Sequence, residues 1–300
     1  MNASLDWYCS HVITECDALV AMSGMSLRTI RAAKKRFGAT AFLERSSQHI
    51  EAQREILQLA PSGETVPDWV VRRELLEYQE ADQIVTLSSH CVETFLERGV
   101  PAEKVSRISL GVDTAQFSPR PYSRAATLRI LFVGTWSYRK GCDILAEAAM
   151  GLEGVEVVHV GSIGDLNFTA APNFRHFDAV DEAKLVDYYG DADVFVLPSR
   201  EDGFGVVLLQ ALACNRRVIA SDCTGGPDLV RDFELGGTVR IVRAGSVDEL
   251  RNALTDARDE FQREGVLATG LNVDRYVFDW RGYGLRYNSL IRRQVDGAQE

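Results

Sequence analysis

The 300-residue sequence lacks several features that define large classes of protein. No apolar run approaches the roughly 20 residues that span a bilayer, and the N-terminal segment has neither the basic region nor the apolar core of a secretory signal. Basic residues are scarce, because 33 Lys and Arg stand against 43 Asp and Glu, and the net charge of −10 argues against a nucleic-acid binder. We therefore expect a cytoplasmic protein that does not bind nucleic acid.

Recognisable metal and phosphate motifs are also missing. The six cysteines form no CxxC pair and have no Cys/His metal spacing, so the sequence predicts reduced thiols. The segment from Gly134 to Gly141 has neither the GxGxxG spacing of a dinucleotide site nor the GxxxxGK[ST] spacing of a P-loop. Asp191-Ala192-Asp193 leads directly into an apolar run, which indicates a helix end and a strand start rather than a metal site.

Short apolar runs alternate with longer amphipathic stretches along most of the chain. The runs are rich in Val and Ile and apolar on both faces, as the strands of a covered parallel sheet are. The alternation indicates βαβ units, so the predicted fold class is α/β with two doubly wound, Rossmann-like domains. The predicted strands cover 18–22, 40–44, 83–87, 105–109, 128–134, 155–161, 174–177, 194–199, 217–221 and 238–242, and the predicted helices lie near 25–37, 48–60, 67–80, 89–98, 181–190 and 206–213, with another from Lys140.

The two predicted domains differ in size. We place the linker at 118–126, where two prolines occur without periodicity. This gives an N-terminal domain over 1–120, a second domain over 127–278 and a C-terminal helix over 279–300. The first domain begins abruptly and offers only about four strands, which would leave an unpaired sheet edge, so we expect it to be truncated or reduced.

The segment 193–226 combines an apolar strand, a polar loop and the start of a helix. In open α/β sheets, ligands bind beyond the carboxyl ends of the strands, against helix N-termini that favour anions. Gly203 and Gly205 allow the backbone to approach a ligand, Asp202 offers an acceptor for hydroxyl groups, and Gln210 follows on the helix. This combination suits a ligand with both hydroxyl and phosphate groups. A purely structural strand-to-helix turn is the alternative.

The same segment resembles the donor site of the group 1 (family 4) glycosyltransferases, which are retaining enzymes of GT-B fold. The resemblance extends over residues 80–295. It implies two domains that face a cleft, with the acceptor on the first and a nucleotide sugar, UDP- or GDP-linked, on the second, and neither a cofactor nor a metal. The other similar stretches are GVDTAQFSP at 111–119, ILFVGTWSYRKGCDIL at 130–145, RVIASDCTGGPDLV at 217–230 and the closing FDWRGYGLRY at 278–287.

The resemblance assigns roles to individual residues. The family motif has two glutamates separated by seven residues around Gly-Phe-Gly, whereas Asp202 and Gln210 occupy these positions here. Glu201 can replace the first glutamate if the loop shifts by one residue, and Thr135 stands where the family has an arginine. The implied contacts are Gly134, Thr135, Arg139 and Lys140 to the diphosphate, Glu201, Asp202, Gly203, Phe204 and Gly205 to the donor sugar, and Gln210 to the ribose.

Lys140 carries the central prediction. It begins a predicted helix after a glycine-containing loop, where its ammonium and the helix dipole both favour bound phosphate. Negative charge grows on the leaving diphosphate during glycosyl transfer, and a preplaced cation stabilises that growth. We predict that Lys140 and Asp202 are catalytic groups in one pocket. An ordinary surface lysine is the alternative interpretation.

Two features of the first domain allow two interpretations each. His49 follows a predicted strand, and we predict it as a third catalytic residue that contacts the sugar or acceptor across the cleft; an ordinary histidine at a helix N-terminus is the alternative. The five basic residues within 28–36 indicate a solvated helix face or a patch for anionic lipid. The second interpretation would place the protein peripherally at the inner face of the membrane.

The leading hypothesis is a metal-independent, retaining glycosyltransferase that acts on a glycan, a lipid-linked sugar or a small molecule. One alternative is an isomerase similar to the nucleotide-sugar 2-epimerases, which share the fold and would release free sugar without an acceptor. The other is a remnant that binds a nucleotide sugar without catalysis.

Overall fold

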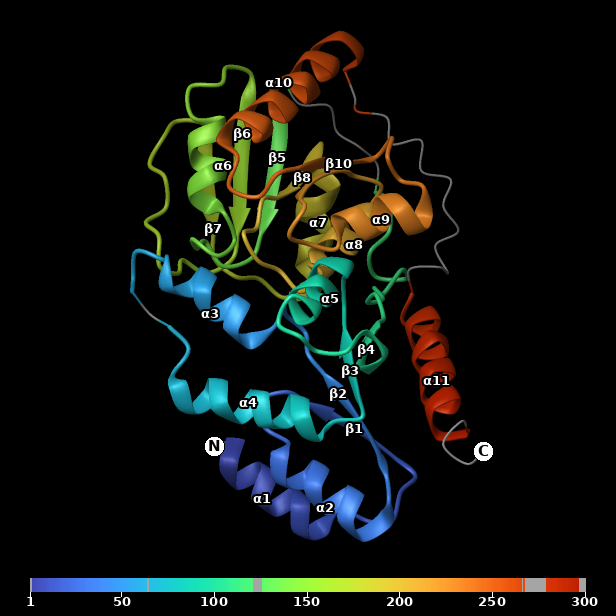
Figure 1. The fold of residues 1–300 in the computed structure, drawn as a ribbon. Helices are drawn as coiled ribbons and strands as arrows, with labels where there is room; N and C mark the ends of the chain where they lie inside the picture. The colour runs from blue at the N-terminus through green and yellow to red at the C-terminus, as the bar shows by residue number, and fades with distance from the viewer. Residues whose placement is uncertain (1, 64, 121–125, 266, 268–278, 297–300) are drawn as a thin grey trace. The chain divides into compact units, whose positions relative to one another are not determined.

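The computed structural model describes residues 2–63, 65–120, 126–265, 267 and 279–296 (Figure 1). The chain forms two compact units. The first comprises Met1–Gln58, Glu64–Ser109 and Tyr283–Glu300, and the second comprises Leu59–Gly63 and Leu110–Gly282. Among the described residues, none of the helices combines the length and the apolar character needed to cross a membrane.

The first unit is built on a four-stranded parallel sheet with the order β1-β2-β3-β4. Each strand therefore lies beside its neighbour in the sequence, and β1 and β4 form the edges. The strands are β1 (Ala18–Met22), β2 (Thr40–Glu44), β3 (Gln83–Thr86) and β4 (Val105–Arg107), and the helices are α1 (Asn2–Val12), α2 (Leu27–Phe37), α3 (Ile50–Gln58), α4 (Asp68–Glu80), α5 (Ser89–Leu96) and the 3-10 turn η1 (Ala102–Lys104).

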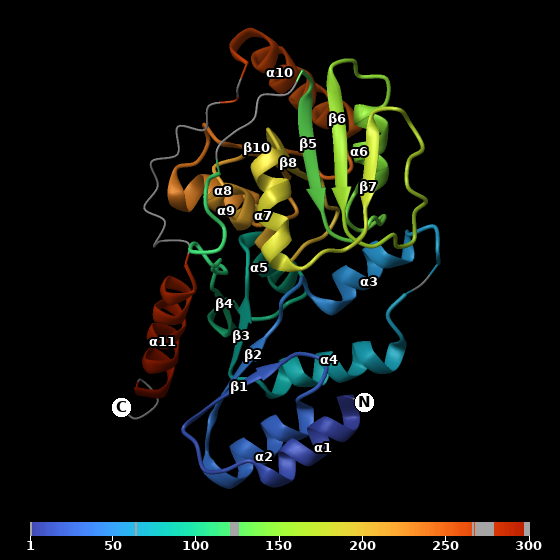
Figure 2. The same cartoon turned by 180° about the vertical axis from the view of Figure 1, so that it is seen from behind.

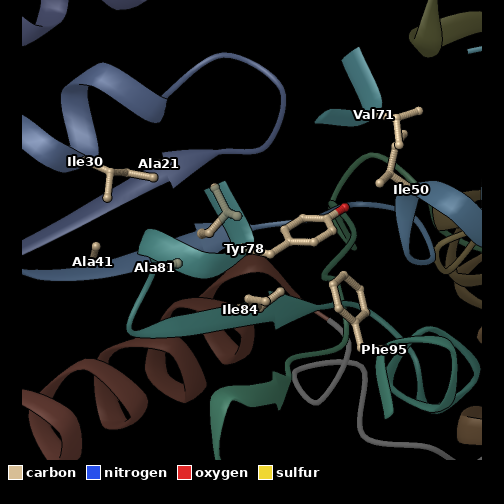
Figure 3. Packing of buried hydrophobic residues seen from close by; sticks show 10 residues of the cluster. Ala21, Ile30, Ala41, Ile50, Val71, Tyr78, Ala81, Ile84 and Phe95 are labelled. Carbon is tan, nitrogen blue, oxygen red and sulfur yellow. The ribbon is translucent and has the colours of Figure 1, made fainter. Parts of the chain in front are cut away.

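The two faces of this sheet pack against different elements, since successive side chains of a strand point to opposite sides. On one face, Ile84 packs with Ile30, Tyr78 and Phe95 from the helices (Figure 3). On the other face, Phe42, Val85 and Ile108 pack with Tyr287 and Leu290 of helix α11 (Trp280–Asp296). The C-terminal helix thus completes the core of the first unit.

The second unit contains a six-stranded parallel sheet with the order β10-β9-β8-β5-β6-β7. Helices α6 and α10 lie on one face and α7 lies on the other, as the two opposite views show (Figures 1 and 2). This is the doubly wound arrangement that the sequence predicted. The strands are β5 (Leu128–Val133), β6 (Val155–Val160), β7 (Phe174–Phe177), β8 (Val194–Leu197), β9 (Arg217–Ser221) and β10 (Val239–Val242), and the helices are α6 (Cys142–Ala149), α7 (Glu182–Asp191), α8 (Val206–Ala213), α9 (Gly226–Phe233) and α10 (Val247–Glu264).

The predicted first domain, 1–120, extends too far, because residues 110–120 belong to the second unit. The ring of Phe117 is fully buried, and its centroid lies 5.8 Å from that of Tyr189 in α7. Phe117 is therefore part of the core of the second unit. Of the predicted linker 118–126, residues 121–125 lie outside the described residues, as do 268–278 before the C-terminal helix.

Candidate functional site

Two loops meet where the strand order of the second sheet reverses. Strands β5 and β8 are neighbours, but the chain continues from β5 to β6 and β7 and from β8 to β9 and β10 on the opposite side. In open α/β sheets, ligands bind outside the carboxyl ends of the strands at such a switch point. The loops that leave these two strands are 134–141, which leads to α6, and 198–205, which leads to α8.

A glycine permits the close approach of the two loops. Gly141 has a φ of 69°, and a Cβ atom added to it would lie 2.1 Å from the carbonyl oxygen of Pro198. The backbone amides of Arg200 and Glu201 donate hydrogen bonds of 2.9 and 3.3 Å to the carbonyl oxygen of Arg139. A side chain at position 141 would therefore force the loops apart.

Two ion pairs connect the loops beside this backbone contact. Nη1 of Arg139 lies 2.9 Å from Oε2 of Glu201, and Nζ of Lys140 contacts Oδ2 of Asp202. The Glu201 side chain is fully buried, whereas 15% of Lys140 and 12% of Asp202 are exposed. The structure thus brings together two of the predicted catalytic residues, and both side chains are partly exposed to solvent.

A third ion pair lies next to these two. The Arg200 guanidinium donates hydrogen bonds of 2.6 Å to each carboxylate oxygen of Asp143 and one of 2.8 Å to the carbonyl oxygen of Tyr138. Its central carbon lies 3.8 Å from the centroid of the Tyr138 ring. Burial alone would lower the pKa of Arg200, but the hydrogen bonds and charge of Asp143 outweigh burial and raise the pKa.

Arg200, Asp143 and Tyr138 were not among the site residues that we predicted from the sequence. Two signals were available: an arginine directly before the acidic pair of the loop, and an aspartate three residues after Lys140. Neither signal shows that these side chains meet, since Asp143 and Arg200 are 57 residues apart in the chain.

Gly134 and Thr135 lie where the first loop leaves β5. The Gly134 carbonyl oxygen accepts a 2.8 Å hydrogen bond from Nε2 of His159, and a Cβ atom on Gly161 would lie 2.1 Å from that oxygen. Thr135 is exposed, and its hydroxyl lies 3.1 Å from that of Ser162. The loop that follows β6 therefore supports the predicted diphosphate residues from the side opposite β8.

Phe204 has a different position from the one expected of a sugar contact. Its side chain is buried and lies so close to Gly225 that a Cβ atom there would be 2.4 Å from the ring. Gly205, with a φ of 80°, directly precedes α8, and Gly203 lies in the same loop. The ring of Phe204 supports the loop, while the backbone from 203 to 205 remains the part that fits the predicted role.

Gln210 is held by α7. It is 5% exposed, its amide oxygen accepts a 2.9 Å hydrogen bond from the Tyr189 hydroxyl, and its amide nitrogen donates a 3.3 Å hydrogen bond to Glu182. A ribose contact would require Gln210 to exchange these partners.

His49 belongs to the first unit and is almost fully buried there. Its ring centroid lies 5.1 Å from that of Tyr78 and 5.0 Å from that of Phe95. Burial, helped by the charges of Arg98 and Arg45, lowers the pKa of His49 from 6.5 to about 4. The ring is a neutral member of the core, and a contact with sugar would require this packing to open.

Two comparisons with solved structures support the architecture. Sucrose-phosphate synthase from Thermosynechococcus elongatus matches 94% of this chain and 74% of its own, with a TM-score of 0.72 and 20% identity. The Anabaena protein Alr3699/HepE in complex with UDP matches 97% of this chain and 81% of its own, with a TM-score of 0.69 and 16% identity. The fold is GT-B. Residues 127–259 of this GT-B chain match the family of glycosyl transferases group 1.

Curated relatives of the GT-B chain carry transferase names. The sulfoquinovosyl transferase SQD2 of Arabidopsis thaliana is 23% identical over 231 residues, which are 72% of this chain and 45% of the relative. The D-inositol 3-phosphate glycosyltransferase of Thermobifida fusca is 29% identical over 218 residues, which are 62% of this chain and 50% of the relative. The chain therefore spans about half the length of the curated relatives it matches.

Proposed function

We propose that the protein is a retaining glycosyltransferase that moves a sugar from a nucleoside-diphosphate sugar to a hydroxyl group of an acceptor. The contact between Lys140 and Asp202 at the switch point carries this proposal, because it joins a cation for phosphate to a carboxylate for sugar hydroxyls. The family match over 127–259 and the transferase names of the relatives support the reaction class.

Lys140 and Arg139 are the groups for the diphosphate. Both are held in place before a ligand arrives, because Asp202 and Glu201 pair with them. As the bond from sugar to diphosphate breaks, negative charge accumulates on the leaving oxygen, and fixed cations stabilise this charge more than they stabilise the ground state. The diphosphate then leaves without a general acid.

Asp202 and the backbone of 203–205 are the groups for the donor sugar. The carboxylate accepts hydrogen bonds from hydroxyl groups, and backbone amides at the start of a helix are donors for oxygen atoms of a ligand. Gly203 and Gly205 carry no side chain that would separate the sugar from this backbone.

The proposal includes both uridine and guanosine donors and more than one class of acceptor. Solved neighbours in complex with UDP and with UDP-glucose favour a uridine nucleotide, while a GDP-mannose-dependent mannosyltransferase among the relatives favours guanosine. That relative acts on a phosphatidylinositol mannoside, which is compatible with a lipid-linked acceptor.

The basic helix α2 bears on membrane contact. Arg31 and Lys34 pair with Glu80 and Asp82 at distances of 2.9 and 2.6 Å, which reduces the charge available to anionic lipid. Arg28 is exposed on the same helix. Peripheral attachment at a membrane therefore depends on fewer cations than the sequence suggested.

Product analysis with UDP- and GDP-sugars tests the proposed reaction. With a suitable acceptor the wild-type protein should form a glycoside of retained anomeric configuration, and Lys140→Ala should lower kcat by about 10²–10³-fold, as expected for a group that stabilises transition-state charge. Lys184→Ala, an exposed lysine of α7 in the same unit, should leave kcat unchanged.

Three results would refute the proposal. Free sugar released without any acceptor would indicate the isomerase, and nucleotide binding without turnover on any acceptor would indicate a binding protein. Turnover that is unchanged in Lys140→Ala would remove the lysine from the mechanism.

A further inference from the structure

Arg200, Asp143 and Tyr138 form a group that we call the clamp. Arg200 belongs to the loop after β8, Tyr138 to the loop after β5, and Asp143 to the first turn of α6. The clamp therefore connects the two loops that carry the candidate donor site, from residues that flank the site on both sides.

The geometry of the clamp favours rigidity. Both guanidinium nitrogens of Arg200 lie 2.6 Å from carboxylate oxygens of Asp143, so the pair has the two-point geometry that fixes orientation as well as distance. The side chain of Arg200 is 14% exposed, and stacking on the Tyr138 ring fixes the plane of the guanidinium. Such a pair is stronger than an exposed ion pair between flexible side chains.

A diphosphate would change the balance of forces between the loops. The ligand attracts Lys140 and so competes with Asp202, which weakens one of the two ion pairs that hold the loops together at the site itself. The clamp contains neither of these residues, so a ligand that engages Lys140 leaves it intact. Because Arg200 is adjacent to Glu201 and Tyr138 is adjacent to Arg139, the clamp also limits how far these loops can shift.

We propose that Arg200 is a positioning residue that, through Asp143 and Tyr138, keeps Lys140 aligned with Asp202 before and during the reaction. This inference rests on the proposed function for its catalytic consequence. Its structural part, the alignment of Lys140, can be measured without any ligand.

The first measurement is the rate at which an amine-acylating reagent modifies each lysine, followed by mass spectrometry. In Arg200→Lys, which keeps the charge but loses the two-point geometry, Lys140 should react several-fold faster than in the wild type. Exposed Lys184 is the internal reference and should react at an unchanged rate. Asp143→Asn, a nearly isosteric second variant, should reproduce the increase if Arg200→Lys does not fold.

The second measurement is steady-state transfer from UDP- and GDP-sugars. Arg200→Lys should lower kcat by about 10- to 100-fold with little change in KM, since a catalytic group displaced by about 1 Å can lose that much rate. The matched control is Arg217→Lys, because Arg217 and Glu260 form a similar two-point pair at 2.7 and 2.6 Å in the same unit, outside the two loops. This control should lose stability by a similar amount and retain kcat.

Lysine reactivity tests the positioning role of Arg200, and turnover tests the proposed transferase, so the two can fail separately. An unchanged reactivity of Lys140 in both Arg200→Lys and Asp143→Asn would overturn the inference, and so would an equal loss of kcat in Arg217→Lys. Increased reactivity of Lys140 in a protein whose wild type turns over no nucleotide sugar would confirm the alignment and refute the transferase.

Discussion

Arg139 and Lys140 are adjacent cations, and each faces a carboxylate of the neighbouring loop, Glu201 or Asp202. The pairing offsets the repulsion between the two cations and leaves part of each available to an anion. The roles of Glu201 and Asp202 differ because their exposure differs. Glu201 is fully buried and pairs with Arg139, whereas Asp202 is partly exposed and is therefore the carboxylate that we propose for a sugar hydroxyl.

Replacing His49 should change how stability depends on pH. The pKa of His49 is lowered from 6.5 to about 4, so the unfolded chain takes up the proton first as the pH falls. The histidine therefore leaves stability intact above pH 6.5 and reduces it between pH 6.5 and 4, by about 1.4 kcal/mol per pH unit. Urea unfolding of His49→Asn over this range should show a shallower pH dependence than the wild type.

His11→Asn provides the control, because His11 is exposed on α1. Its pH dependence should equal that of the wild type. A pH dependence that is the same in all three proteins would show that His49 is not buried as a neutral ring.

Gln210→Ala distinguishes packing from ribose binding. The variant removes the nearer of two acceptors of the buried Tyr189 hydroxyl, since the Val207 carbonyl oxygen lies 3.4 Å away, and it should lower the free energy of unfolding by about 1 kcal/mol. Tyr189→Phe, which removes the same hydrogen bond from the other side, should retain the wild-type affinity for UMP and GMP, and we expect the same of Gln210→Ala. If Gln210→Ala binds UMP or GMP more weakly and Tyr189→Phe does not, Gln210 contacts the ribose as the sequence predicted.

At the scale of the elements, the meeting of the two loops depends on Gly141. Gly141→Ala should disrupt the site, because alanine meets both an unfavourable φ of 69° and the Pro198 carbonyl oxygen. Gly151→Ala is a matched control with a φ of 70° and no atom within 4 Å of the added Cβ. The control should lose about 1–2 kcal/mol of stability from the backbone alone, and Gly141→Ala should lose more. Equal losses, measured by urea unfolding, would contradict the close approach of the loops.

Strand β1 is an edge of the first sheet, with Val20 45% and Met22 55% exposed. Among the described strands it pairs with β2, and an apolar edge of this kind favours association between chains. Met22→Lys should therefore reduce concentration-dependent self-association in light scattering. Met150→Lys, a similarly exposed methionine at the end of α6, should have little effect, and equal effects of the two variants would contradict a role for the edge.

The sequence predicted the bounds of strands and helices best where the spacing of apolar residues was clear. Strands β1, β2 and β9 have the predicted bounds because strands of a parallel sheet are apolar runs between turns. Strand β7 also has the predicted bounds, although Arg175 and His176 interrupt its apolar run. Helix α1 was not predicted, since Leu5, Trp7 and Tyr8 are exposed and provide no core-facing period. Helix α10 was missed although Leu250, Leu254 and Phe261 recur at helical spacing and are buried, so its signal was present.

At the scale of the whole molecule, the pairing of Lys140 with Asp202 was predictable because it follows from topology. Neighbouring parallel strands at a switch point place their carboxyl ends together, and the resemblance identified both loops. The burial of His49 and the pairing of Gln210 were not predictable, because each depends on side chains from other helices. The contact between Arg200 and Asp143 likewise depends on the folded path of both loops.

The two units have separate sheets and cores, and the candidate donor site lies within the second. Nucleotide binding can therefore be examined independently of acceptor choice. A nucleoside diphosphate differs from its monophosphate by one phosphate group. The ratio of the two affinities therefore measures the contribution of the residues that bind this second phosphate.

The most direct measurement is calorimetric titration of UDP, UMP, GDP and GMP into the wild type, Lys140→Ala and Lys184→Ala. We expect the wild type and Lys184→Ala to prefer one diphosphate over its monophosphate. Lys140→Ala should lose about 10- to 100-fold of affinity for that diphosphate alone, as expected for one charge-assisted hydrogen bond. A Lys140→Ala variant that retains the full preference for the diphosphate would contradict the account.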